Sequence, residues 1–247
     1  MYSFTSRVRY SEVNRKKQLE FSSIINYFQD CSTFHSEDNG QGIDLLESKK
    51  HAWILNSWQI VVNRYPDLGE TIKVGTLAYD FKSMYGFRNF ILQDTNDTTL
   101  AVANSIWVLM DTTTMRPIKI TEEDISGFQI EDKLDMDYAP RKITLPEDFK
   151  DNKTTNSTGI YNEYQPFPVI KSNIDTNNHV NNSQYIKMAE EFLPAKFIIK
   201  QMRAEYRMAA VLGDTIIPQV LIDEEICTVV LANIEKRPYV IIEFISA

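Results

Sequence analysis

The sequence contains few of the residues that mark several specialised classes of protein. It has 2 cysteines, 3 histidines, 8 glycines and 9 prolines in 247 residues. Cys31 and Cys227 are far apart and form no CxxC motif, so we expect neither a disulfide framework nor a cysteine metal site. So few glycines and prolines exclude fibrous and low-complexity architectures. A globular protein remains, and 43% hydrophobic residues are enough for a packed core.

Long apolar segments and an excess of positive charge are also missing. No run approaches the roughly 18 apolar residues of a membrane helix. Met1–Tyr10 has the polar alternation of a strand rather than the pattern of a secretion signal. We therefore expect a soluble, cytoplasmic protein with no membrane span. The net charge of −8 would be repelled by a phosphate backbone, so we expect no nucleic-acid partner.

Two segments from opposite halves of the chain align without gaps, Val13–Leu19 and Ile174–Val180. Each is followed by apolar residues at the spacing i, i+3, i+4, i+7, which predicts a helix with one buried face. These apolar residues are Phe21, Ile24, Ile25 and Phe28 in the first half and Tyr185, Met188, Ala189 and Phe192 in the second. Further along, Leu68–Ile72 resembles Leu212–Ile216. The chain therefore reads as two copies of one unit.

Each copy continues with segments rich in β-branched and aromatic residues, which predict antiparallel strands. The predicted strands are Thr71–Asp80, Phe87–Gln93, Leu100–Asp111, Thr215–Asp223, Ile226–Ile234 and Pro238–Ile245. One helix followed by several such strands indicates an α+β fold. We predict an N-terminal domain over residues 1–120, a linker over 121–158 and a C-terminal domain over 159–247. Within the linker, Thr121–Asp124 predicts the start of a short helix, and Asp151–Thr158 predicts a flexible connector.

A known family resembles this chain over most of its length. The segment Asn173–Ile186 resembles the signature D-x-N-x-H-V-N-N-x-x-Y-I of acyl-acyl-carrier-protein thioesterases of plants and bacteria. Matching segments in the first half are Ala52–Leu55, Arg64–Pro66, Trp107–Asp111 and Thr114–Pro117. The resemblance implies a double hotdog, meaning two tandem helix-wrapped antiparallel sheets. It also implies hydrolysis of fatty acyl-acyl carrier protein to free fatty acid, as in fatty acid biosynthesis.

The signature contains the candidate catalytic residues Asp175, Asn177 and His179. These residues alternate, so we expect them to lie along an extended segment and to point to one side. A helix is expected to begin near Val180 and Asn181, where its first N–H groups could bind developing negative charge. Another interpretation is that Asp and Asn only cap this helix. Capping needs one such residue and no histidine, and the resemblance implies catalysis, for which no metal or organic cofactor is needed.

Several other polar residues have simpler interpretations. His35 and His51 are expected to be structural, since three scattered histidines without clustered carboxylates do not make a metal site. A basic stretch in the second half is either a solvated face or a docking surface for an acidic carrier protein. It consists of Lys196, Lys200, Arg203 and Arg207.

One position departs from the family pattern. The family often has E-Y-R-x-E after the second helix, and this chain has Glu205 in the first place but Ala209 in the last. Four residues of strand span about 13 Å, so Glu205 cannot replace the missing carboxylate. The proton chemistry is therefore expected to rest on Asp175 and His179, either by activating water or with Asp175 attacking directly.

Two other functions remain open. One is hydrolysis of acyl-CoA rather than acyl carrier protein, and the other is a non-catalytic acyl-binding protein, which the alanine at position 209 would suit. The expected partners are acyl carrier protein and a fatty acyl thioester, and a homodimer is left open.

Overall fold

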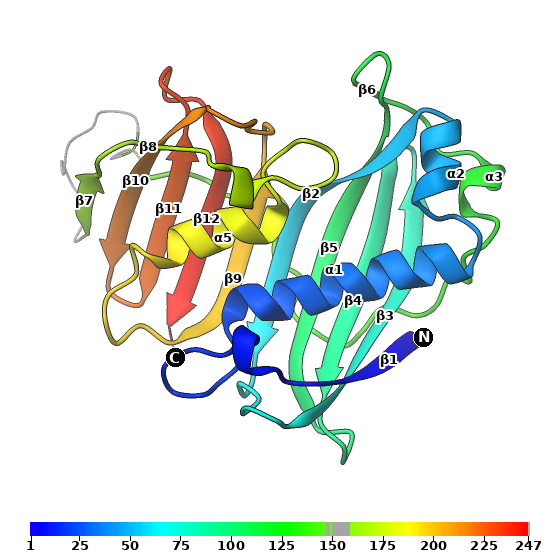
Figure 1. Cartoon of the computed structure of the whole chain (residues 1–247), viewed down its shortest axis with the longest axis horizontal. Coiled ribbons are helices and arrows are strands. Elements are labelled where there is room, and N and C mark those ends of the chain that lie inside the picture. Colours follow the sequence, from blue (N-terminus) through cyan, green and yellow to red (C-terminus); the bar gives the residue numbers. More distant parts are fainter. Residues whose placement is uncertain (147–148, 150–158, 247) are drawn as a thin grey trace. The chain divides into compact units, whose positions relative to one another are not determined.

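The computed structural model describes residues 1–146, 149 and 159–246. The chain forms two compact units, Met1–Ala139 and Pro140–Ala247 (Figure 1). Residues 121–139, which we assigned to a linker, belong to the first unit. The predicted limits at 120 and 159 stay a prediction, and the predicted connector Asp151–Thr158 lies outside the described residues.

The first unit contains an antiparallel sheet and one long helix. Its strands are hydrogen-bonded in the order β1-β3-β4-β5-β2, and β6 pairs with β5. In Figure 1, α1 lies across one face of this sheet. The elements are β1 (Tyr2–Arg7), η1 (Tyr10–Glu12), α1 (Phe21–Asp38), α2 (Ile43–Ser48), β2 (His51–Val62), β3 (Thr71–Lys82), β4 (Tyr85–Gln93), β5 (Thr99–Asp111), β6 (Arg116–Pro117) and α3 (Glu122–Ile125).

The apolar stripe predicted for the first helix forms the core of this unit. All four of its residues are buried on α1. The ring of Phe28 lies 5.2 Å from that of Phe90 on β4 and 6.2 Å from that of Trp58 on β2. A helix with one apolar stripe is stable here because the apolar face of the sheet removes that stripe from water.

Residues 134–139 cover the opposite face of the same sheet. Asn89 follows Arg88 and precedes Phe90, so its side chain points away from α1. Its Oδ1 accepts hydrogen bonds from the N–H of Leu134 at 3.0 Å and from the hydroxyl of Tyr138 at 2.8 Å. Asn89 is buried, and these bonds satisfy its amide while they hold the covering segment.

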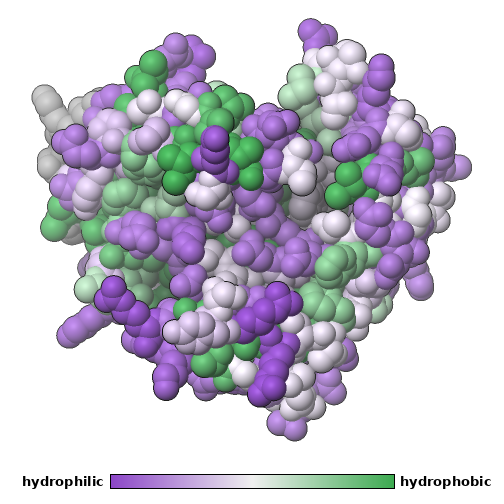
Figure 2. Space-filling model, viewed as in Figure 1, coloured by the Kyte–Doolittle hydropathy of each residue, from purple (hydrophilic) through white to green (hydrophobic). Residues whose placement is uncertain are grey.

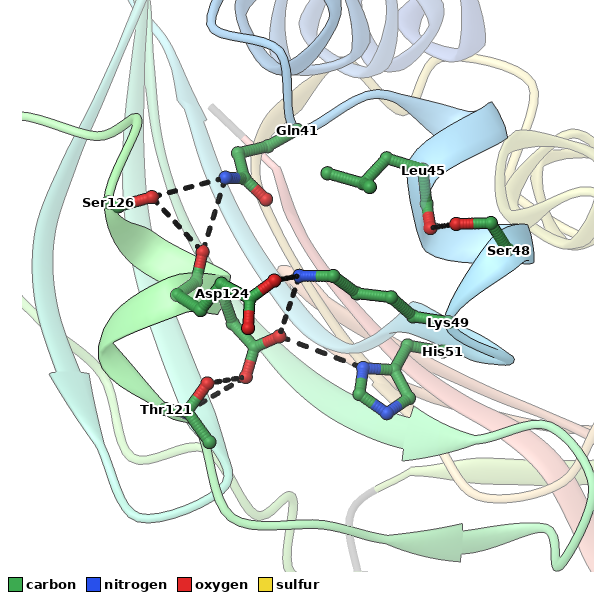
Figure 3. A network of polar contacts seen from close by, with 9 residues as sticks. Gln41, Leu45, Ser48, Lys49, His51, Thr121, Asp124 and Ser126 are labelled. Carbon is green, nitrogen blue, oxygen red and sulfur yellow. Dashed lines mark hydrogen bonds and ion pairs between the residues drawn. The ribbon is translucent and has the colours of Figure 1, made fainter.

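Figure 3 shows a polar network that holds α3 against α2 and the start of β2. Asp124 is buried, and its carboxylate accepts hydrogen bonds from the N–H and hydroxyl of Thr121, at 2.9 and 2.7 Å. The same carboxylate lies 3.9 Å from Nζ of Lys49 and 3.7 Å from Nδ1 of His51. The short helix predicted after Thr121 is confirmed, and His51 takes part in a structural network.

The second unit repeats this plan with a shorter helix. Its strands are paired antiparallel in the order β9-β12-β11-β10-β7, with β8 beside β10. The elements are β7 (Ile160–Glu163), β8 (Phe167–Pro168), η2 (Lys171–Asn173), α5 (Asn182–Glu190), β9 (Ile199–Tyr206), β10 (Thr215–Asp223), β11 (Ile226–Ala232) and β12 (Pro238–Ser246). In both units the ends of the predicted strands differ from the observed ones by no more than two residues.

The helix predicted in the second half ends earlier than expected. Tyr185 and Ala189 are buried on α5 as predicted, but Phe192 lies beyond its last residue, Glu190. The N–H groups of Phe192 and Leu193 bond three residues back, to Ala189 and Glu190, which tightens and closes the helix. Pro194 follows, and proline cannot continue a helix.

Candidate active site

Asp175 and His179 face each other at the base of a tight turn. The N–H of Asp175 donates to the carbonyl of His179 at 2.8 Å, and Ile174 and Val180 form an antiparallel bridge just outside them. Facing residues in such a pair have Cβ atoms roughly 5 Å apart. The two candidate proton acceptors therefore start from neighbouring backbone positions.

The expectation of an extended segment is wrong. Asn178 has a positive φ of 60°, and its N–H donates to the carbonyl of Asp175 at 3.1 Å. Oδ1 of Asp175 accepts the N–H of Asn177 at 2.8 Å and that of His179 at 3.3 Å. The chain reverses here because a short Asx side chain can replace a backbone acceptor. Asn177 therefore lies exposed in the turn, and the three side chains do not alternate along a strand.

The aligned segment of the first unit makes the same turn. Oδ1 of Asn14 accepts the N–H groups of Lys16 and Gln18, at 2.8 and 3.2 Å. The N–H of Asn14 donates to the carbonyl of Gln18 at 2.8 Å, and Lys17 has a φ of 62°. Asn14 thus holds the turn with a neutral amide. The charge of Asp175 is not needed for the shape of the turn, which leaves the charge to be explained by function.

The helix that follows the turn is capped by its own side chain. Oδ1 of Asn181 accepts the N–H and the hydroxyl of Ser183, both at 2.9 Å. The predicted capping role therefore belongs to Asn181, whereas Asp175 holds the turn. One N–H at the start of α5 is already used by this cap, so the binding of an oxyanion there stays a prediction.

Ala209 lies beside this turn. The carbonyl of the next residue, Ala210, accepts the N–H of Val180 at 2.9 Å, and its own N–H donates to the hydroxyl of Tyr185 at 2.8 Å. Burial raises the pKa of Tyr185 above its usual range, so this hydroxyl stays protonated. Ala209 is therefore next to the residue that joins the loop after β9 to the turn, and its side chain is only a methyl group.

Glu205 faces the other side of the sheet. Its neighbour Tyr206 points towards α5, because its hydroxyl donates to the carbonyl of Asn182 at 3.0 Å. The side chain of Glu205 consequently lies on the opposite face, 6% exposed, where Oε2 accepts the N–H of Ile143 at 2.9 Å. This position agrees with the expectation that Glu205 does not replace a carboxylate at position 209.

Part of the predicted basic stretch is paired with neighbouring groups. Arg203 pairs with Glu243 at 3.0 Å and also donates to the carbonyls of Pro140 and Lys142. Arg207 lies 3.3 Å from Oε2 of Glu205. Arg203 and Arg207 are therefore engaged in contacts within this unit. The other two cations of the stretch, Lys196 and Lys200, are exposed.

Reasoning from the sequence missed the residues that support the turn. Asn173 accepts the N–H of Asn181 on its carbonyl at 2.9 Å and the N–H of Ile170 on Oδ1 at 3.0 Å. Glu12 does the same in the first unit, for Glu20 and Arg9. Extending the repeat alignment backwards from Val13 would have paired Glu12 with Asn173. Tyr185 gave no such signal, because its tertiary partner Ala210 carries no polar side chain.

Comparison with known proteins identifies the family. The N-terminal domain of acyl-ACP thioesterases matches residues 1–128, and the C-terminal domain of the same family matches residues 158–231. The chain belongs to the acyl-ACP thioesterase family. A chloroplastic palmitoyl-acyl carrier protein thioesterase of Arabidopsis thaliana is 27% identical over 216 residues, which are 81% of this chain and 50% of that protein. This chain thus spans about half the length of the curated relatives it matches.

Solved structures of the family share the fold. An acyl-ACP thioesterase from Bacteroides thetaiotaomicron has a TM-score of 0.86 at 18% identity, covering 99% of this chain and 97% of that one. The 12:0-ACP thioesterase from Umbellularia californica has a TM-score of 0.85 at 20% identity, covering 100% and 96%. The predicted α+β double hotdog is confirmed.

Neither a membrane helix nor a metal site is found in the part of the chain that the structure describes. None of its helices has the length and hydrophobicity needed to span a bilayer. In the same part of the chain, no group of three or more His, Cys, Asp or Glu side chains is placed to hold a metal ion. Both cysteines are free and buried. That catalysis needs no cofactor stays a prediction.

Proposed function

We propose that this chain hydrolyses fatty acyl thioesters of acyl carrier protein to free fatty acid and carrier protein. The main support is that Asp175 and His179 face each other in a turn whose shape does not require the aspartate charge. Membership of the acyl-ACP thioesterase family supplies the class of substrate. A cytoplasmic location stays a prediction, and the question of a homodimer stays open.

The arrangement assigns different tasks to the two oxygens of Asp175. Oδ1 holds the turn through two backbone N–H groups, while Oδ2 makes no hydrogen bond with the described residues. In the proposed reaction, His179 or Oδ2 takes a proton from water as the water oxygen bonds to the thioester carbon. The C–S bond then breaks, and the departing thiolate takes up the proton. In the alternative route Oδ2 attacks the same carbon and the C–S bond breaks with loss of the thiolate, and water then hydrolyses the mixed anhydride to release the fatty acid and restore Asp175.

The proposal predicts a specific difference between two substitutions of Asp175. Asp175→Asn keeps an acceptor for the turn, as Asn14 does in the first unit, but removes the charge. It should leave folding intact and lower kcat by about 10² to 10⁴, the contribution of a positioned acid or base. His179→Ala should do the same. The measurement is release of free fatty acid from a panel of acyl carrier protein thioesters, with far-ultraviolet circular dichroism as the check on folding.

Two results would contradict this assignment. A kcat for Asp175→Asn close to that of the wild type would show that the charge has no chemical role. Effects of Asp175→Asn and His179→Ala that simply multiply in the double variant would show that they do not act as one unit. Equal turnover of acyl-CoA would favour the acyl-CoA hydrolase, and tight acyl binding without any turnover would favour the binding protein.

A further inference from the structure

In both units the same backbone hydrogen bond supports the loop beside the turn, so the residues of the two loops can be paired position by position. The carbonyls of Val8 and Val169 accept the N–H groups of Gly69 and Gly213, at 3.0 and 3.1 Å. Both glycines have positive φ, 81° and 89°, which favours glycine over other residues. The loop over residues 64–70 of the first unit therefore corresponds to the loop over residues 208–214 of the second.

In the first unit this surface is charged and its charges are paired. Arg64 binds Glu70 through two hydrogen bonds, at 2.6 and 2.9 Å. Arg9 lies 3.5 Å from Glu12. Such pairs are well solvated and leave little reason for another molecule to bind.

In the second unit the same positions carry exposed apolar side chains. Met208 replaces Arg64, Val211 replaces Asp67 and Ile170 replaces Arg9. Only Leu212, the counterpart of Leu68, is apolar in both units. The exposed fractions are 54% for Ile170, 36% for Met208, 43% for Val211 and 53% for Leu212. These four residues are called the apolar collar below, and Figure 2 shows hydrophobic side chains gathered over the loop between β9 and β10.

The turn and the loop are also less tightly joined in the second unit. In the first unit the N–H of Leu68 donates to the carbonyl of Lys17 at 2.8 Å, and Gln18 forms a bridge with Asp67. Within the described part of the second unit, neither contact has a counterpart between the 174–180 turn and Leu212 or Val211. Among the described residues, the turn beside the collar is therefore joined to the loop through Val180 and Ala210 but not through Asn178 or His179.

We propose that the apolar collar binds the phosphopantetheine arm of acyl carrier protein. This inference rests on the proposed function, because a thioester at Asp175 and His179 has its acyl chain on one side and its thiol-bearing arm on the other. The acyl chain needs full burial, which an exposed collar cannot give, whereas the arm stays at the surface because its other end is attached to the carrier. Its methyl and methylene groups fit exposed apolar side chains.

One cation beside the collar fits the phosphate at the carrier end of the arm. Lys171 is exposed and follows Ile170 directly, and it has no ion-pair partner among the described residues. Its counterpart in the first unit is Tyr10. The arm of coenzyme A continues into an adenosine with further phosphates, and a single lysine is poorly suited to that charge. The collar therefore fits the arm as the carrier protein presents it.

The experiment compares two matched substitutions, Leu212→Asp in the collar and Leu68→Asp at its counterpart. Leu212→Asp should raise KM for acyl carrier protein thioesters about tenfold, since losing one apolar contact costs roughly 1–2 kcal/mol. Its kcat and its turnover of a short-chain thioester that lacks the arm should be unchanged. Leu68→Asp should change none of these values. Lys171→Ala should abolish a roughly two- to fivefold preference for acyl-phosphopantetheine over acyl-pantetheine.

A binding measurement separates this inference from the proposed function. Carrier protein bearing the arm but no acyl group should bind the wild type more tightly than carrier without the arm, and Leu212→Asp should remove that difference. If no thioester is turned over, the proposed function is contradicted. The binding comparison still tests whether the collar binds the arm, because it does not depend on turnover. The proposal that the collar binds the arm is contradicted if Leu212→Asp and Leu68→Asp have the same effect on KM and on carrier binding. It is also overturned if Leu212→Asp raises KM only for acyl-CoA.

Discussion

At the scale of single residues, Glu205 and its neighbour Tyr206 on β9 lie on opposite faces of the sheet and make different contacts. Neighbouring residues of a strand point to opposite faces. Tyr206 therefore takes part in the contacts of α5, while Glu205 fixes the N–H of Ile143 on the far side of the sheet. Ile143 packs there against Val230, Ala232 and Ile241.

We predict that substitutions of Glu205 affect stability rather than turnover. Glu205→Ala leaves a buried N–H of Ile143 without its acceptor, which should lower the free energy of unfolding by about 1–3 kcal/mol. Glu205→Gln keeps an acceptor oxygen and should cost less. Both should retain kcat within a few fold, measured beside urea unfolding curves. A loss of turnover by Glu205→Gln as large as that of His179→Ala would show that Glu205 reaches the reacting groups.

His35 gives a second prediction, on pH. Its Nδ1 lies 2.9 Å from Nη1 of Arg88, and burial together with this charge lowers the pKa of His35 from 6.5 to about 4. The unfolded chain therefore takes up the proton first as the pH falls. The stability that the neutral imidazole provides is complete above about pH 6.5 and is lost progressively towards pH 4.

His35→Gln removes this titration while keeping a side-chain acceptor for Arg88. The wild type should lose about 1 kcal/mol more than this variant between pH 7 and pH 5, allowing for partial solvent screening. Urea unfolding of both proteins at the two pH values makes the comparison. Parallel losses of stability in the two proteins would rule out a neutral buried His35.

At the scale of elements, the 13–19 and 174–180 turns show that a backbone motif can be kept while its chemistry changes. Both use an Asx side chain and a residue with positive φ. The side chains facing the Asx residue differ, with Gln18 in one turn and His179 in the other. The first turn lacks a group able to take a proton near neutral pH.

We predict that the first turn has no part in catalysis. Replacing Asn14, Lys16 and Gln18 together by Ala should leave kcat nearly unchanged. The same variant should be less stable, because the turn loses the acceptor on Asn14. Steady-state kinetics on folded protein is the measurement. A loss of turnover equal to that of His179→Ala would move the active site to the first unit.

At the scale of the whole molecule, net charge bears on how the proposed partner, acyl carrier protein, would approach. The chain has a net charge of −8, and acyl carrier protein is acidic. Our sequence-based interpretation offered a basic stretch as a local attraction. Because Arg203 and Arg207 pair with Glu243 and Glu205, long-range repulsion is expected to outweigh it.

Salt should therefore assist the encounter. Raising ionic strength from about 0.01 M to about 0.15 M shortens the screening length from about 30 Å to about 8 Å. KM for acyl carrier protein thioesters should fall, while KM for an uncharged short thioester should not change. An increase of KM with salt would show that a basic surface attracts the carrier after all, and reversing Lys196 and Lys200 would then test whether these lysines supply it.

Patterns in the sequence were enough to predict the elements and their duplication. Apolar spacing predicted α1 and its buried residues, segments rich in β-branched and aromatic residues predicted the strands, and the aligned segments predicted two similar units, because these patterns depend on residues close along the chain. The family signature singled out Asp175, Asn177 and His179. Tertiary structure decided how they are arranged, since the positive φ of Asn178 and the side-chain bonds of Asp175 turn an apparent strand into a reversal. It also decided the role of Glu205, because its partner Ile143 lies far away in the sequence and only folding brings the two together.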